Sequence, residues 1–279
     1  MRLVLDSVGL TYDRGLPTAR SGLGGVSLSI DAGDAVAIMG PTGSGKTTLL
    51  EIAAGLVPPT TGSVSLAGAG SGASLKSSVG LVYQFPELQF FEETVFDEVA
   101  YGLRAARVAE DELARRVHAA LECVGLSPAA FTERSPLTLS AGEQRRAAIA
   151  ALVVLERPFL LLDEPSAGLD PGTRERILDL IHREREAGRA ILLVTHDPEL
   201  AEETVERIVL LSGGSIVADG PPADVFGDGV LLERLGLEAP PAHELVNALS
   251  CVDPALARDV ASVVLGTPAL RDGASSGRF

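Results

Sequence analysis

One segment has the residue types and the spacing of a loop that binds phosphate: Gly40-Pro41-Thr42-Gly43-Ser44-Gly45-Lys46-Thr47. The glycines let backbone N–H groups wrap around phosphate oxygens, and a helix starting here would add its N-terminal dipole. We expect Lys46 to reach the terminal phosphates of a nucleotide, Thr47 to place its hydroxyl on Mg²⁺, and Thr48 to join the nucleotide-binding residues. The alternative, a chance Gly-rich turn, is weakened by the apolar run before the loop and the helix-forming residues after it.

Two carboxylates, Asp163 and Glu164, follow the apolar run Phe159–Leu162. The carboxyl ends of strands form the functional edge of an open α/β sheet. There Asp163 could hold Mg²⁺ through water, and Glu164 could orient and polarise an attacking water in phosphoryl transfer. The alternative is that these residues only cap a strand, and the phosphate loop upstream makes this the weaker interpretation.

The elements that must position these residues follow from hydrophobic periodicity. Two leading runs, Arg2–Leu10 and Gly25–Ile30, alternate apolar and polar residues and predict an N-terminal antiparallel β subdomain. Later apolar runs alternate with helical segments, which predicts an α/β fold with a mainly parallel core sheet. Residues 86–155 have helical spacing and are predicted to form a helical insertion. The later elements are predicted at these ranges: strands at Ala35–Met39, Phe159–Leu162, Ala190–Thr195 and Arg207–Leu211, and helices at Lys46–Ala54 and Thr173–Glu186.

Length and composition limit the organisation of the chain. The 279 residues can hold one large α/β domain, predicted at 1–225, and a small C-terminal appendage at 226–279. Short helices are expected at 229–236 and 254–265, and Gly273–Phe279 is expected to be frayed. No apolar run approaches the roughly 20 residues that cross a bilayer, and no leader pattern is found, so a cytosolic chain is expected.

Charge and cysteine content narrow the function classes. The formal net charge of −15 opposes attachment to nucleic acid or to anionic lipid, so any membrane attachment should run through a protein partner. The two cysteines, Cys123 and Cys251, are far apart and predict neither a disulfide framework nor a zinc site.

A second short motif, Leu139-Ser140-Ala141-Gly142-Glu143-Gln144, lies between the phosphate loop and the acidic pair. In this order the motifs resemble those of ATP-binding cassette (ABC) ATPases, from the N-terminus to about residue 225. The resemblance implies a P-loop NTPase that binds ATP and Mg²⁺ and hydrolyses ATP to drive transmembrane transport.

The resemblance also implies roles for single residues. Gln84 would link the metal site to the helical insertion, and His196 would contact the γ-phosphate. Tyr12 matches the aromatic residue that stacks on adenine, although a packing role is an equal alternative for it. Asp170 lies in a segment resembling the loop that crosses the dimer interface. Alone, a His at a strand end is more often structural, but the position of His196 after an apolar strand favours the catalytic role.

The short motif at 139–144 resembles the ABC signature, which acts on nucleotide held by a second ATPase subunit in a head-to-tail pair. Ser140 and Gly142 would then donate hydrogen bonds to the γ-phosphate in trans. Two residues depart from the usual Leu-Ser-Gly-Gly-Gln. Ala141 adds a Cβ, which matters if the position needs positive φ or a very close approach of the phosphate. Glu143 brings a carboxylate near a polyanion, partly offset by a helix N-terminus.

The segment Tyr83–Val95 resembles the corresponding region of the ATPase subunits of energy-coupling factor (ECF) importers, which take up vitamins or transition-metal ions. That resemblance implies a polytopic membrane coupling subunit, a separate membrane substrate-binding subunit and a peripheral place on the cytoplasmic face of the cell membrane. It predicts a groove for coupling helices, with acidic and aromatic candidates at Glu87, Phe90, Phe91, Glu92 and Glu93. For each of these, a solvated or locally packed position is an equal alternative.

Three other functions stay open at this stage. One is a non-catalytic or regulatory half of an asymmetric ABC dimer, which the intact Lys46, Asp163, Glu164 and His196 disfavour. Another is the ATPase of a different type of ABC importer. The third is a soluble cassette acting on ribosomes or DNA, which the chain length and negative charge disfavour.

Overall fold

The computed structural model describes residues 1–70, 72–85 and 90–265. Glu87 and the segment Gly273–Phe279 therefore lie outside the described residues. The strands are β1 (Arg2–Tyr12), β2 (Arg20–Asp31), β3 (Ala35–Met39), β4 (Thr61–Ala67), β5 (Val79–Val82), β6 (Phe159–Asp163), β7 (Ala190–Val194), β8 (Arg207–Ser212) and β9 (Ser215–Gly220). The helices are α1 (Lys46–Ala53), α2 (Leu75–Ser78), α3 (Val95–Ala105), α4 (Glu110–Cys123), α5 (Pro128–Phe131), the 3₁₀ turn η2 (Pro136–Thr138), α6 (Ala141–Val153), α7 (Pro171–Glu186), α8 (Pro198–Thr204), α9 (Pro222–Gly227), α10 (Gly229–Leu235), α11 (Pro241–Ser250) and α12 (Pro254–Val264).

The central sheet has the strand order β5-β6-β7-β3-β8-β9. Its first five strands are parallel, which confirms the predicted mainly parallel core. β9 pairs antiparallel with β8 and closes one edge as a hairpin. A second, antiparallel sheet has the order β2-β1-β4, so the N-terminal β subdomain is confirmed, with β4 joining the two predicted strands.

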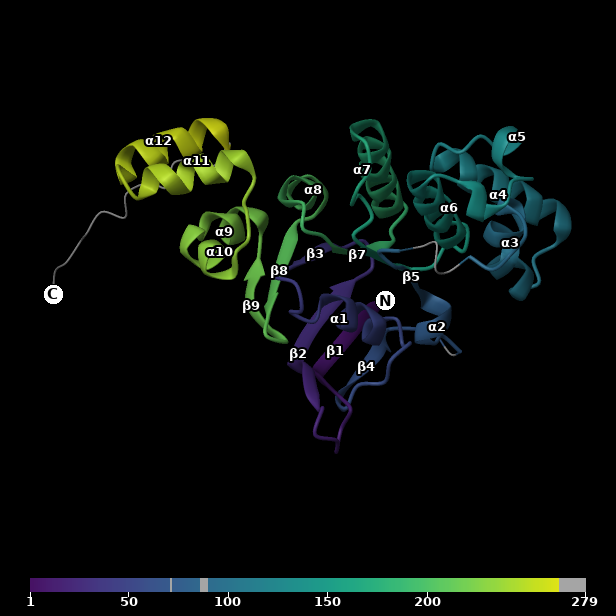
Figure 1. Cartoon of the computed structure of the whole chain (residues 1–279), viewed down its shortest axis with the longest axis horizontal. Coiled ribbons are helices and arrows are strands. Elements are labelled where there is room, and N and C mark those ends of the chain that lie inside the picture. Colours follow the sequence, from purple (N-terminus) through teal and green to yellow (C-terminus); the bar gives the residue numbers. More distant parts are fainter. Residues whose placement is uncertain (71, 86–89, 266–279) are drawn as a thin grey trace.

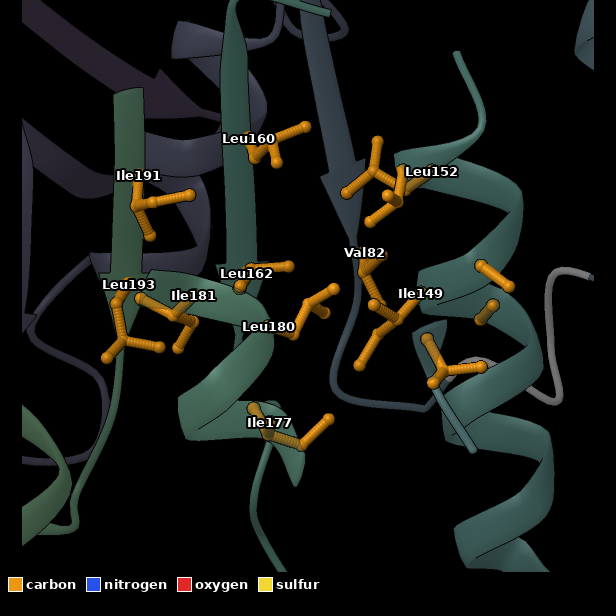
Figure 2. Packing of buried hydrophobic residues seen from close by; sticks show 14 of the residues in the cluster. Val82, Ile149, Leu152, Leu160, Leu162, Ile177, Leu180, Ile181, Ile191 and Leu193 are labelled. Atoms are coloured by element: carbon orange, nitrogen blue, oxygen red, sulfur yellow. The ribbon is translucent and has the colours of Figure 1, made fainter. Parts of the chain in front are cut away.

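The parallel strands are continuously apolar because helices or the second sheet cover both of their faces. All residues of β3, β6 and β7 are buried. On one face, Ile177, Leu180 and Ile181 of α7 pack against Leu162 and its neighbours on β6 and β7 (Figure 2). On the other face, a second buried cluster joins the central sheet to α1 and to the antiparallel sheet.

Helices α3 to α6 lie together at the β5 edge of the central sheet (Figure 1). Their common core includes Leu113, Val117 and Leu121 of α4, whose helical spacing placed them on one face. The side chain of Thr94 accepts a hydrogen bond from the backbone N–H of Asp97 and so caps α3. α6 begins at the short motif and packs Ile149 and Leu152 beside Val82 of β5, so this helical segment is fixed to the central sheet (Figure 2).

Between β9 and residue 265, where the described part of the chain ends, four helices, α9 to α12, lie beside the opposite edge of the sheet (Figure 1). α10 and α12 lie where short helices were expected, whereas α9 and α11 were not anticipated. Phe226 of α9 is fully buried, and both it and Leu232 belong to the main core cluster. The division at residue 225 stays a prediction. Among the described residues, no helix combines the length and the apolar character needed to span a bilayer.

Candidate functional site

The phosphate loop connects β3 to α1 and places its backbone at the carboxyl edge of the central sheet. Gly45 has φ 104°, and a Cβ there would lie 2.6 Å from the carbonyl oxygen of Gly22. Only glycine fits such a position without strain. The buried Lys46 donates hydrogen bonds from Nζ to the carbonyl oxygens of Gly40, at 2.7 Å, and Pro41, at 3.0 Å. The ammonium group is therefore held within the loop itself.

One feature of the loop, the hydroxyl of Ser44, suits an anion. The Ser44 hydroxyl is buried and has no hydrogen-bond partner in the described part of the chain. A buried hydroxyl without a partner is costly, and a phosphate oxygen in the loop could satisfy it. Burial also lowers the pKa of Lys46, while Glu164 and Asp163 act in the opposite direction.

A hydroxyl and a carboxylate meet beside the loop. Thr47 Oγ1 donates a hydrogen bond of 2.8 Å to Asp163 Oδ2. Oxygen ligands of this kind, supplemented by phosphate and water, suit Mg²⁺. Across the described ranges, no three His, Cys, Asp or Glu side chains are grouped to hold a metal ion. The Thr47–Asp163 pair has the donor types for such an ion, and a Mg²⁺ ion at this place stays a prediction.

Glu164 stands at the end of β6 in a sparsely populated backbone conformation. Its φ is 50°, its N–H donates to the carbonyl of Val194 at 2.9 Å, and its side chain is buried. Such a conformation persists when the surrounding structure enforces it, and it is common at functional sites. Burial raises the pKa of Glu164 to about 7, and the charge of Asp163 adds to the shift. A carboxyl group with this pKa can exchange protons near neutral pH.

His196 lies next to Glu164, across the ends of β7 and β6. Its backbone N–H donates to Glu164 Oε2 at 3.3 Å, and its Nε2 lies 3.5 Å from Glu164 Oε1. Burial and the charge of Lys46 lower the pKa of His196, so the ring is held neutral near pH 7. The predicted base and the predicted γ-phosphate contact are thus neighbours, although 32 residues separate them.

An open cleft of about 970 Å³ joins these groups. Its lining contains residues predicted to bind nucleotide or metal, namely Tyr12, Thr42, Gly43, Gly45, Lys46, Thr47, Thr48, Gln84, Asp163, Glu164 and His196. Gly40, Pro41 and Ser44 belong to the same loop but do not line the cleft. Tyr12 is partly exposed, and its hydroxyl lies 2.8 Å from the Thr48 hydroxyl.

The sequence interpretation missed part of this cleft. Its lining also includes Asp13, Thr18, Arg20, Ser21, Gly22 and Val194. Five of these six lie in the turn between β1 and β2 or at the start of β2, where Arg20 pairs with Tyr12 in the antiparallel register. The available signal was the predicted antiparallel pairing of Arg2–Leu10 with Gly25–Ile30, because it places the segment that connects them beside Tyr12.

The short motif begins α6 and does not line the cleft. The Ser140 side chain accepts a hydrogen bond from the N–H of Glu143, and the Glu143 carboxylate accepts from both the N–H and the hydroxyl of Ser140, at 2.8 and 2.9 Å. This reciprocal capping box was readable from the Ser-x-x-Glu spacing. Ala141 is not among the residues with positive φ, so its Cβ imposes no backbone strain. The adjoining Gly142 has only Leu169 Cδ2 near its Cβ position, at 3.4 Å.

Asp170 caps α7 rather than contacting the cleft. Its carboxylate accepts hydrogen bonds from the N–H of Thr173, at 3.0 Å, and from its hydroxyl, at 2.7 Å. The capping hydrogen bonds lower the pKa of Asp170, so the carboxylate is ionised. Its predicted role in a dimer interface stays a prediction.

The fold and the cleft define a phosphate-loop nucleotide-binding domain of the ATPase type. Comparison with known proteins narrows this class. The family model described as ABC transporter matches residues 23–167. The energy-coupling factor transporter ATP-binding protein EcfA2 of Symbiobacterium thermophilum is 39% identical over 284 residues, covering 100% of this chain and 98% of that relative. The EcfA2 protein of Acetivibrio thermocellus is 40% identical over 268 residues, covering 94% and 95%.

The solved structures that resemble this fold are also ATP-binding cassettes. The dimeric ATP-binding cassette MJ0796, in a post-hydrolysis state bound to ADP and Pi, matches with a TM-score of 0.72 and 31% identity over 79% of this chain and 98% of that one. The cbiO1 protein of Clostridium perfringens, part of the ABC transporter complex cbiONQ, matches with a TM-score of 0.71 and 27% identity over 91% and 96%. The chain belongs to the ABC transporter ATP-binding family and is an ATPase of that type.

Proposed function

We propose that this protein binds and hydrolyses ATP to power an ECF-type membrane importer of a micronutrient, either a vitamin or a transition-metal ion. The observation that carries the enzymatic part is the single cleft that brings together the phosphate loop, the Thr47–Asp163 pair and the Glu164–His196 pair. The importer part is supported by the EcfA2 relatives, which match over nearly the whole chain.

The geometry suggests how each residue acts on ATP. Lys46 would exchange its carbonyl partners for oxygens of the terminal phosphates, while the loop N–H groups hold the phosphate chain. Thr47, Asp163 and Gln84 would hold Mg²⁺, which when bound neutralises charge on the β- and γ-phosphates. Tyr12 would stack on the adenine at the open end of the cleft.

The proton step falls to Glu164. Its ionised carboxylate would accept a proton from the attacking water, and its pKa near 7 suits that transfer. The neutral His196 beside it would orient the carboxylate and contact the γ-phosphate. Arg145, Lys46 and His196 face Glu164 and favour its ionised form, whereas Asp163 opposes it.

The short motif supports a head-to-tail pair of ATPase subunits. None of Ser140, Ala141, Gly142 and Glu143 lines the cleft of its own chain, although the start of α6 exposes Ser140. We infer that Ser140 and Gly142 complete the site of a second, identical or related subunit. Binding of ATP would close the pair, with Asp170 in the loop at the interface, and hydrolysis would let it reopen.

The remaining partners follow from the importer assignment. A polytopic membrane subunit would receive the motion of closure, and a separate membrane subunit would bind the micronutrient. The protein would then sit peripherally on the cytoplasmic face of the membrane. A net charge of −15 is consistent with attachment through protein contacts and with the absence of a nucleic-acid partner.

Purification from native membranes tests the importer assignment. We expect the tagged chain to retain a multispanning membrane protein and a second ATPase subunit through size-exclusion chromatography. A matched purification of a tagged, unrelated cytosolic protein from the same membranes controls for nonspecific retention. Failure to enrich any multispanning protein would contradict the importer assignment while leaving the ATPase assignment intact.

A further inference from the structure

Arg145 lies one turn into α6 and points into the protein rather than into solvent. The residue is only 8% exposed, which is unusual for an arginine. Nη2 donates to the carbonyl oxygen of Gln84 at 2.5 Å, and Nη1 donates to the carbonyl oxygen of Ala167. One guanidinium thus joins α6 to two segments that lie 61 and 22 residues away.

Both of these segments carry residues of the nucleotide cleft. Gln84 follows β5 and is among the residues that line the cleft. Ala167 follows Glu164 closely, and its N–H donates to the Glu164 carbonyl at 3.3 Å. Arg145 therefore fixes the backbone on two sides of the reaction centre without itself lining the cleft.

The chemistry of this link requires arginine. A guanidinium is planar, keeps its charge and directs several N–H groups at fixed angles, so it can hold two carbonyls at once. A lysine ammonium is a single point donor on a flexible stem and cannot reproduce that geometry. Hydrogen bonds from a charged donor are also stronger than neutral ones, which suits a link that must transmit movement.

We propose that Arg145 is a positioning residue that couples α6, the helix beginning at Ser140, to the Gln84 and Ala167 segments of the catalytic site. Movement of α6 when Ser140 engages a second subunit would displace both segments together. The proposal rests on the proposed ATPase function, because it assigns Arg145 to the control of that reaction. It explains why a buried charge stands at this position of the helix.

Arg157 provides a matched control. It is a half-buried arginine just before β6, and its Nη1 donates to the carbonyl oxygen of Val79 at 2.7 Å. Val79 begins β5, whereas Gln84 follows the end of the same strand. Arg157 therefore makes a similar link at the far end of β5, away from the cleft.

The test combines kinetics with amide hydrogen exchange in the complex purified from membranes. We expect Arg145→Lys to lower kcat for MgATP about tenfold and to leave KM within about twofold, because it misplaces catalytic groups rather than the phosphate loop. Arg157→Lys should leave both constants near those of the wild type. Arg145→Gln also lacks the guanidinium and its paired donors, so its kcat should be lowered as well.

Amide hydrogen exchange tests the hydrogen bonds from Arg145 to Gln84 and Ala167 independently of ATP hydrolysis. In the nucleotide-free protein, Arg145→Lys should speed exchange in peptides containing Gln84 and Ala167, while Arg157→Lys should speed it only near Val79. An unchanged kcat in Arg145→Lys, equal losses of kcat in both lysine variants, or unchanged exchange at Gln84 and Ala167 would each overturn the proposal. Wild-type hydrolysis that is insensitive to Glu164→Gln would instead overturn the proposed function, and the exchange data would still decide whether Arg145 forms the link.

Discussion

At the scale of single residues, the buried carboxyl of Glu164 links catalysis to stability. Its pKa rises from 4.5 in the unfolded chain to about 7 in the folded protein, so the folded state holds the proton more tightly. Between those two pKa values the folded protein binds more protons than the unfolded chain. The contribution of Glu164 to the free energy of unfolding is therefore greatest below about pH 4.5. It is lost as the pH rises toward about 7.

This sign predicts that Glu164→Gln stabilises the nucleotide-free protein at pH 8. Removing the buried charge should raise the free energy of unfolding by about 2 kcal/mol at pH 8 and by little at pH 5. Urea denaturation at the two pH values in the presence of a chelator measures the difference. The exposed Glu175→Gln is the control, with no change expected at either pH. A Glu164→Gln variant that is less stable than the wild type at pH 8 would contradict the burial argument.

Glu143 also acts at the residue scale, because its carboxylate holds both hydrogen-bond donors of Ser140. These bonds lower the pKa of Glu143, and Arg134 lies 4.0 Å away, so the carboxylate is ionised. It stabilises the start of α6 but places negative charge where the phosphate of a second subunit would bind.

We therefore predict opposite effects of Glu143→Gln on folding and on nucleotide. The free energy of unfolding should fall by less than about 1 kcal/mol, because a charged cap is lost. The KM for MgATP should fall about twofold to threefold, because a repulsive charge near the phosphate is removed. Glu133→Gln makes the same change in net charge at an exposed position and serves as the control. A higher KM in Glu143→Gln would show that the carboxylate assists binding.

At the scale of elements, the C-terminal helices share the main core. Phe226 of α9 is fully buried in the same cluster as the strands. His243 of α11 lies beside it, at 5.7 Å between ring centroids, and bonds Glu202 of α8 at 2.9 Å. These contacts attach α9 and α11 to the ATPase fold.

Phe226→Ala should therefore destabilise the whole fold. The expected loss is about 3 to 5 kcal/mol, from lost burial and the cavity that remains. Val230→Ala, at a position 79% exposed on α10, should change the free energy of unfolding by less than about 0.5 kcal/mol. Urea unfolding followed by circular dichroism compares them. A loss below 1 kcal/mol for Phe226→Ala would mean that α9 is only loosely attached.

Some elements could be predicted from the sequence because their signals are local. The phosphate loop has a fixed spacing, and the run Phe159–Leu162 with its two carboxylates has the pattern of a buried parallel strand. Neither the antiparallel pairing of β9 nor the link from Arg145 to Gln84 could be predicted. Both depend on which distant segments become neighbours, and local periodicity contains no information about that.

At the scale of the whole molecule, the nucleotide cleft and the motif at 139–144 are separate surfaces of one chain, because none of the residues from Ser140 to Glu143 lines the cleft. The β subdomain and the phosphate loop line the cleft, whereas α6, which Ser140 caps, lies among the helices at the β5 edge (Figure 1). Under the proposed head-to-tail pairing, the motif of one subunit would complete the cleft of the other. Coupling to a membrane partner would then follow from relative movement of the helical segment and the sheet.

The steady-state ATPase rate of the membrane-purified complex tests most directly whether Glu164 is the base for ATP hydrolysis in this cleft. We predict that Glu164→Gln lowers kcat at least about a hundredfold while MgATP binding stays within about threefold of the wild type, because the amide keeps the shape of the side chain but cannot accept the proton. Equal hydrolysis rates in wild type and Glu164→Gln would contradict the account.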